Sequence, residues 1–302
     1  MKIRLNPIVK KDLQVAVRSM RMSWGLFVYE GALTVAFLLA LRTIQMMSSY
    51  LSTGNIDSSL VYLFPVTAVV QVCIVALYIP IITSTSISGE KERQTFDIML
   101  TTCISPFSIV FGKVISAVLR ILFLVAASMP IMAMSFVVGG LNWSNLFYYL
   151  LALMLFSVFS GSIGILASSL CQKSVTAVFL SFIINFVFFV LTFIPMITRA
   201  IFGTSSAGES MLPLLVNPAV FFEEFFMQIM TGESLLGMEG GSFDLDEAGF
   251  ITYALARGKL WMFVSAGCIL LLSFLFMALA AWKINPMHSG AGRRSSKKRG
   301  SM

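Results

Sequence analysis

The chain has 302 residues, of which 58% are hydrophobic and 12% are charged, and its formal net charge is +7. This composition, with a mean hydropathy of +0.90, lies outside the range of soluble domains and predicts an integral membrane protein. Most basic residues stand between or beside apolar runs, so the positive charge indicates membrane topology and gives no reason to expect a nucleic-acid partner.

The first predicted element is an amphipathic helix over residues 7–22, within an interfacial segment at 1–23. One face is apolar (Val9, Leu13, Ala16, Val17, Met20) and the other is polar and basic (Lys10, Lys11, Gln14, Arg18, Arg21). Such a helix lies along a membrane surface, where its basic face meets anionic lipid. The alternative is that it steers the first span during transport.

Six apolar runs then meet the requirement of roughly 20 residues for a helix that crosses a bilayer. We place them near 24–46, 60–86, 112–138, 146–169, 175–198 and 260–283. The runs are continuously apolar and do not alternate as barrel strands do. The predicted fold is all-α and polytopic, a single transmembrane domain over 1–302.

The distribution of basic residues predicts the orientation, because cytoplasmic loops carry an excess of Lys and Arg. With both termini in the cytoplasm, 16 of the 21 basic residues lie inside, four lie outside and one lies within a span. The opposite orientation would leave only four inside, so we expect a multi-pass protein of the cell membrane with cytoplasmic termini. A basic tail at 284–302 is predicted to be disordered.

Two ionisable residues fall inside predicted spans, where such residues are costly and are functional candidates. Glu30 lies about six residues into the first span, and Arg120 lies seven residues after Lys113 in the third. Their similar depth makes them a candidate intramembrane ion pair. The alternative is that each residue reaches the membrane surface or pairs separately.

A charged segment at 89–102 separates the second and third spans and is predicted to lie in the cytoplasm. Ser88 is positioned to cap a short helix whose first turn carries Glu90 and Glu92, where a helix favours carboxylates. Phe96 would stand beside Arg93 and Asp97 on that helix. The segment is either a solvated loop helix or a docking surface for another protein.

The fourth span carries Ser157, Gly161, Gly164 and Ser168 at spacings that align small residues on one face. This pattern favours close helix packing, within the chain or against a second copy, over a substrate-lining role. An external loop at 199–259 follows the fifth span. Within it, Asn217 and Pro218 read as the capped start of a helix rich in phenylalanine.

The stretch from Glu90 to Leu100 (Glu-Lys-Glu-Arg-Gln-Thr-Phe-Asp-Ile-Met-Leu), continued by Ile104 to Lys113, resembles the type-2 exporter permeases of the ATP-binding cassette (ABC) superfamily. The surface helix, the six spans and the external loop extend the resemblance over nearly the whole chain. It implies a cytoplasmic coupling helix that docks in a cleft of a separate ATPase subunit, and two permease halves, identical or different, that pair to form an export path. The coupling surface implied by the resemblance is Glu90, Glu92, Arg93, Thr95, Phe96 and Asp97.

The chain shows no phosphate-binding loop of its own. The nearest match, Gly112-Lys113, has Phe107 where the motif needs glycine and Val114 where it needs a hydroxyl ligand for Mg²⁺. We therefore expect ATP and Mg²⁺ on a partner subunit, and no catalytic, cofactor or metal site in this chain.

Three other functional classes fit the sequence less well than a permease subunit. An intramembrane enzyme would need a nucleophile with a base, a set of metal ligands or a pair of membrane-embedded aspartates, and the sequence has none of these. A secondary transporter or channel would gather polar residues at the midplane of the membrane, whereas the main polar cluster here is cytoplasmic. A membrane anchor for an ATPase that transports nothing is the remaining alternative. None of these patterns identifies the cargo.

Overall fold

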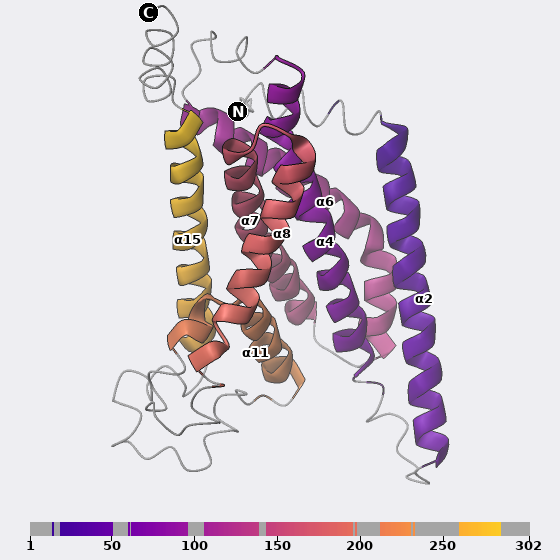
Figure 1. Cartoon of the computed structure of the whole chain (residues 1–302). Coiled ribbons are helices and arrows are strands. Elements are labelled where there is room, and N and C mark those ends of the chain that lie inside the picture. The colour runs from indigo at the N-terminus through magenta and orange to yellow at the C-terminus, as the bar shows by residue number, and fades with distance from the viewer. Residues whose placement is uncertain are drawn as a thin grey trace, which may run out of the picture.

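The computed structural model describes residues 14, 19–50, 60, 62–95, 106–138, 143–195, 197, 212–230, 232 and 260–284. This part of the chain contains helices and no strand (Figure 1). Its six long helices are α2 (Met20–Tyr50), α4 (Leu63–Glu92), α6 (Pro106–Val138), α7 (Trp143–Leu170), α8 (Ser174–Leu191) and α15 (Leu260–Ile284). All six are long and apolar enough to cross a membrane, so the predicted all-α polytopic fold is confirmed.

The interfacial helix predicted at 7–22 lies outside the described residues except at positions 14 and 19–22. The basic tail predicted at 284–302 also lies outside them beyond Ile284.

The helices run up and down between two ends of the molecule (Figure 1). The start of α2 and the end of α15 lie at one end, together with the end of α4, the start of α6 and the connection from α7 to α8. The short helix η1 (Leu212–Val216) and helix α11 (Pro218–Met230) lie at the opposite end. Six long helices therefore bring the start of α2 and the end of α15 to the same side, as an even number of spans requires.

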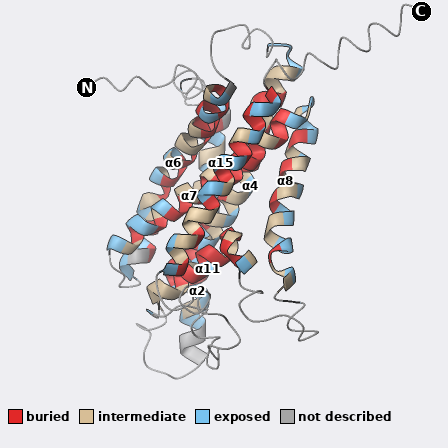
Figure 2. Cartoon of the chain, turned by 90° about the vertical axis from the view of Figure 1, so that its left-hand side faces the viewer, coloured by how far each residue is buried: buried red, intermediate tan, exposed pale blue. Residues whose placement is uncertain are grey.

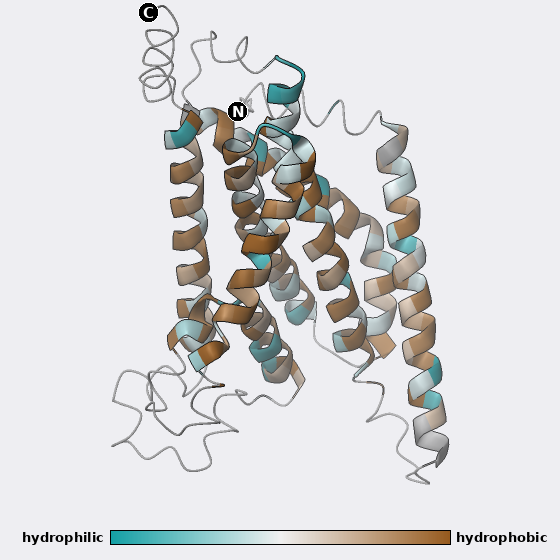
Figure 3. Cartoon of the chain, in the orientation of Figure 1, coloured by the Kyte–Doolittle hydropathy of each residue, from teal (hydrophilic) through white to brown (hydrophobic). Residues whose placement is uncertain are grey.

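Helix α7 is the central helix of the bundle. It packs against α4, α6, α8 and α15, and its residues are mostly buried (Figure 2). Helix α2 packs against α4 and α6 at one edge. The outer faces of the helices carry large apolar side chains, which is the surface that a bilayer covers (Figure 3).

The small residues of α7 face α4 at close range. A Cβ added at Gly164 would overlap the Thr83 hydroxyl and would lie 2.9 Å from the Thr83 Cβ and 3.3 Å from the Ser84 backbone nitrogen. At Gly161 the nearest atom is the Thr83 Cγ2 at 3.6 Å, an ordinary contact. The absence of a side chain at Gly164 is therefore what lets the two backbones approach.

The two serines of the same stripe differ in their partners. The Ser168 Oγ accepts hydrogen bonds from the backbone N–H groups of Ile87 (3.0 Å) and Ser88 (2.8 Å) on α4. The Ser157 Oγ instead donates to the Leu153 carbonyl of its own helix at 2.6 Å. The half of the stripe nearer the end of α7 therefore holds α4 both by packing and by hydrogen bonds.

A buried hydrogen-bond network links four helices inside the bundle. The Gln71 amide on α4 donates to the Tyr29 hydroxyl on α2 (2.8 Å) and to the Ser128 hydroxyl on α6 (3.0 Å). The Tyr149 hydroxyl on α7 donates to the Gln71 carbonyl oxygen at 3.0 Å. By contrast, the Asn185 amide donates to the Ser181 carbonyl of its own helix. The Gln71 side chain therefore links helices, whereas the Asn185 amide bonds within one helix.

Helix α11 begins as the sequence predicted. The Asn217 Oδ1 accepts the Ala219 N–H at 2.9 Å, which caps the helix, and the Asn217 Nδ2 donates to the Thr192 hydroxyl at 2.7 Å. The helix then buries four phenylalanines against α4 and α7 (Phe221, Phe222, Phe225, Phe226). This end of the bundle is therefore closed by an aromatic cluster.

Candidate functional site

The end of α4 is the most hydrophilic part of the described helices (Figure 3). A helix of 30 residues is about 45 Å long, which exceeds a hydrocarbon core of roughly 30 Å. The surplus length allows the charged residues at this end, 90–93, to lie beyond the apolar part of the membrane. We call residues 90–95 the charged end of α4.

The helix stops through a Schellman motif. Gln94 adopts the left-handed conformation with a φ of 57°, and its N–H donates to the Lys91 carbonyl at 3.1 Å. The Thr95 N–H donates to the Glu90 carbonyl at 3.0 Å. These two bonds satisfy carbonyls that the helix end would otherwise leave without partners.

The predicted N-cap at Ser88 is wrong. Ser88 lies inside α4, its hydroxyl donates to the Ser84 carbonyl at 2.7 Å, and its side chain is buried. The sequence places a capping residue before two glutamates, a pattern that resembles a helix start. In the structure the serine is instead a small residue that fits beneath α7, and Glu90 and Glu92 belong to the last turn of the same helix.

Glu90 contacts α6. Its Oε1 lies 2.8 Å from the Lys113 Nζ, and the same ammonium donates to the Ser86 carbonyl at 2.9 Å. The Lys113 side chain is 3% exposed and that of Glu90 is 28% exposed. The pair therefore ties the start of α6 to the end of α4 in a place that is mostly shielded from water.

Lys91 contacts the end of α7. Its ammonium donates to the backbone carbonyls of Ser168, Ser169 and Cys171, at 3.4, 2.5 and 3.3 Å. These carbonyls belong to the last turn of α7 and the residue after it, where the helix dipole is negative and a cation is favourable. Lys91 therefore acts as a cap supplied by another helix.

Glu92 contacts the start of α8. Its Oε2 accepts hydrogen bonds from the Ser174 hydroxyl at 2.6 Å and from the Ser174 N–H at 3.3 Å. Ser174 is the first residue of α8, whose amino end favours a carboxylate. Three consecutive residues, Glu90 to Glu92, thus bond to three different helices.

Two further residues of the predicted coupling surface follow. Arg93 and Thr95 are exposed, and the Thr95 hydroxyl donates to the Glu90 carbonyl at 3.3 Å. Phe96 and Asp97, also predicted for this surface, lie outside the described residues. Glu92 is exposed as well, although its carboxylate bonds to Ser174, so the exposed part of the charged end is Glu92 to Thr95 and Glu90 lies behind it.

The intramembrane candidates Glu30 and Arg120 lie on α2 and α6, two helices that pack together. The Glu30 Oε1 is buried and accepts no hydrogen bond from the residues that the structure describes. The pairing of Glu30 with Arg120 stays a prediction.

No local pattern in the sequence indicates the bonds from Lys91 to α7 and from Glu92 to α8. The partners are separated by about 80 residues, and two of the acceptor groups at α7 are backbone carbonyls of serines, which carry no signal of their own. The sequence does carry a signal for the pair of Glu90 and Lys113. Lys113 is a basic residue near the start of the apolar run that follows the acidic segment.

This arrangement defines a multi-pass α-helical membrane protein with a charged, mutually bonded group of helix ends on one side. A family model described as "ABC-2 family transporter protein" matches residues 31–282, and the chain belongs to this family. The protein is thus a transmembrane component of an ABC transporter and is not itself the catalytic subunit. Membership implies pairing with an ABC ATPase subunit. A search of curated proteins found no match.

Proposed function

We propose that this chain is the permease subunit of an ATP-driven exporter, which forms the transport path and is driven by a separate ATPase subunit that binds ATP and Mg²⁺. Two permease halves, either two copies of this chain or this chain with a different permease, would form the complete path. The complex would reside in the cell membrane with both termini of this chain in the cytoplasm, in agreement with the excess of basic residues on that side.

The observation that carries the proposal is the bonding of Glu90, Lys91 and Glu92 to three helices. A partner that pushes or pulls the exposed residues Arg93 to Thr95 acts on the end of α4. Because that end is bonded to α6, α7 and α8, the displacement is shared by four helices at once. Packed helices respond to such a displacement as rigid bodies, which is the motion that alternating access requires.

The docking surface is narrower in this proposal than the sequence suggested. Glu90 is largely shielded and holds α6 of the same chain, so it transmits the motion instead of meeting the ATPase directly. Glu92, Arg93 and Thr95 are exposed and remain for direct contact, with Phe96 and Asp97 proposed to extend the surface.

The test compares exposed charges at the two ends of the molecule. The purified complex with its ATPase subunit is reconstituted in proteoliposomes, and ATPase stimulation and ATP-dependent transport are measured for Arg93→Glu and for Glu223→Arg. Glu223 is exposed on α11, at the end opposite Arg93, and serves as the control. We expect Arg93→Glu to weaken both readouts and Glu223→Arg to change neither.

The proposal would be overturned if Arg93→Glu bound and stimulated the ATPase normally. Transport by the lone chain under an ion gradient would favour a secondary transporter or channel. A stable ATPase complex without any ATP-dependent transport would favour a membrane anchor.

A further inference from the structure

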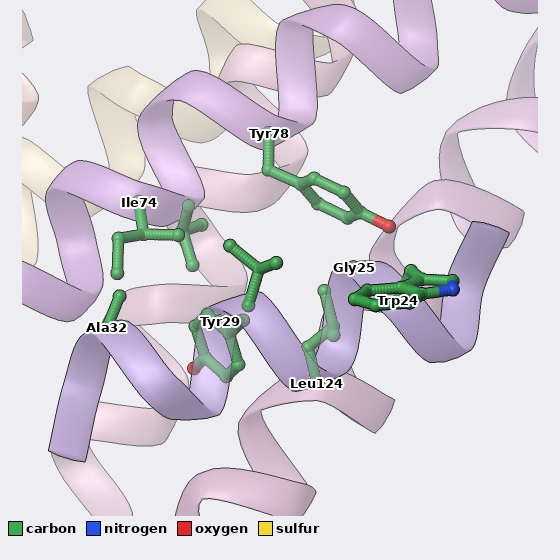
Figure 4. A pocket seen from close by; sticks show the side chains of 9 residues that line it. Trp24, Gly25, Tyr29, Ala32, Ile74, Tyr78 and Leu124 are labelled. Carbon is green, nitrogen blue, oxygen red and sulfur yellow. The ribbon is translucent and has the colours of Figure 1, made fainter.

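A narrow apolar groove lies between α2 and α4, with α6 at its floor (Figure 4). Its volume is about 420 Å³, within the usual size of ligand pockets. Trp24, Gly25, Val28, Tyr29 and Ala32 of α2 form one wall, Ile74, Val75 and Tyr78 of α4 form the other, and Leu124 of α6 forms the floor. The groove has almost no polar lining, so its occupant has an apolar body.

One end of the groove lies near the membrane surface on the side of the charged end of α4. Trp24 stands close to the start of α2, and its side chain is exposed, as is typical of tryptophans at the lipid headgroup level. Tyr78 lies at the same level, because its hydroxyl is 3.9 Å from the position of a Cβ at Gly25. In Figure 4 this hydroxyl points toward the Trp24 end of the groove.

A cation marks the same end. Arg120 is one helical turn before the floor residue Leu124 on α6, on the same face of that helix and nearer its start. The guanidinium has five N–H donors in a planar fork that matches a phosphate, so it can bind phosphate oxygens while it keeps another partner. A long side chain at this depth reaches the headgroup region readily.

We infer that the groove is a binding site for one anionic phospholipid of the adjacent leaflet, with an acyl chain between α2 and α4 and the phosphate at Arg120. The inference does not depend on the ATPase or on the cargo. Helix α2 lies at the edge of the bundle, and the lipid would fill the space that side chains leave open between α2 and α4.

The size of the groove favours an acyl chain over a helix of a second copy. Trp24 to Ala32 span eight residue steps, or about 12 Å of helix, and a helix segment of that length and of 10–12 Å diameter occupies roughly 900–1,400 Å³. The groove offers about 420 Å³ between two helices that already touch. A single hydrocarbon chain fits such a space and a helix does not.

The cation decides which lipid binds. Apolar walls do not favour a bound acyl chain over the surrounding bilayer, because lipid tails are as apolar as the side chains. The preference among lipids must therefore come from the polar end of the groove. A basic residue near the membrane surface attracts an anionic headgroup by an amount that corresponds to about a fivefold preference.

The test uses two glycines of α2 as a matched pair. A leucine at Gly25 enters the groove, whereas Gly31 does not line the groove and has no atom within 4 Å of an added Cβ. Variants that retain Trp24 as their only tryptophan are placed in phosphatidylcholine nanodiscs, and quenching is titrated with brominated phosphatidylglycerol or brominated phosphatidylcholine. Native mass spectrometry of the chain with all its tryptophans gives an independent count of retained phosphatidylglycerol.

We expect brominated phosphatidylglycerol to quench Trp24 at about a fivefold lower mole fraction than brominated phosphatidylcholine. Gly25→Leu should abolish both this preference and the retained lipid, Gly31→Leu should keep both, and Arg120→Gln should bring the preference close to one. Equal quenching by the two lipids in the unmodified groove would overturn the inference. So would a Gly25→Leu variant that keeps its lipid but loses a dimer, since the groove would then be an interface between copies.

Discussion

The contact between Gly164 and Thr83 makes a quantitative prediction about how α7 holds α4. In Gly164→Ala, the new methyl group overlaps the Thr83 hydroxyl and lies 2.9 Å from the Thr83 Cβ and 3.3 Å from the Ser84 backbone nitrogen. All three atoms belong to backbone or to the stiff β-branched side chain of Thr83, so the helices must separate. Overpacking of this kind typically costs about 1–3 kcal/mol.

Gly161→Ala is the matched control, because it adds the same methyl group to the same helix. Its nearest neighbour, the Thr83 Cγ2, is at 3.6 Å, and the next is at 3.9 Å. Both variants gain the same helix propensity, about 0.5–1 kcal/mol, which therefore cancels in their comparison. The difference between them isolates the cost of the close approach.

The assay is the thermal unfolding midpoint of each variant in the same detergent. A difference of about 1–3 kcal/mol corresponds to roughly 2–12 °C, with Gly164→Ala the less stable variant. Thr83→Ala removes the hydroxyl that the new methyl meets first, so it should recover part of the loss in the Gly164→Ala background. Equal midpoints for the two glycine variants would refute the packing argument.

Three further predictions concern the Glu90–Lys113 pair, the Gln71 network and the Asn217 cap. The unfolding midpoint is measured for each variant. Glu90→Met should cost about 1–3 kcal/mol and more than Lys113→Met, because it leaves the Lys113 ammonium, whose side chain is 3% exposed, without its counter-charge, whereas the Glu90 side chain is 28% exposed; the reverse order would contradict the burial of the pair. Gln71→Leu should cost about 0.6–1.7 kcal/mol of stability per lost bond between helices. Asn185→Leu should cost much less, because the Asn185 amide bonds within its own helix. Similar losses of stability in the two variants would argue against the network. Asn217→Ala should cost about 0.5–2 kcal/mol and speed proteolysis near α11, and unchanged cleavage would show that the cap is dispensable.

The sequence predicted the class of fold well, because the signals involved are local. Each span is a continuous apolar run, and a chain in hydrocarbon must satisfy its backbone within the segment, which leaves the helix as the solution. The cap at Asn217 was also predictable, since its acceptor bonds a residue two positions along the chain. The family resemblance rested on the same kind of contiguous pattern.

The sequence misled where a local pattern had two meanings. Ser88 before two glutamates resembles the start of a helix, but the apolar run before it continues the helix through that point. The deciding fact is the contact with α7, where Ser88 is fully buried and its N–H donates to the Ser168 hydroxyl. Nothing within a few residues of Ser88 encodes that contact.

The sequence by itself therefore determined that this is a six-span membrane protein with a charged segment on its basic side, because hydropathy and charge act along the chain. Only the tertiary structure decided what that segment does within the molecule. Glu90, Lys91 and Glu92 bond to α6, α7 and α8 because the packing of Gly164 on α4 brings residues up to 82 positions apart to one place. Contacts of that kind depend on how helices meet in space, and the order of residues along one helix does not contain them.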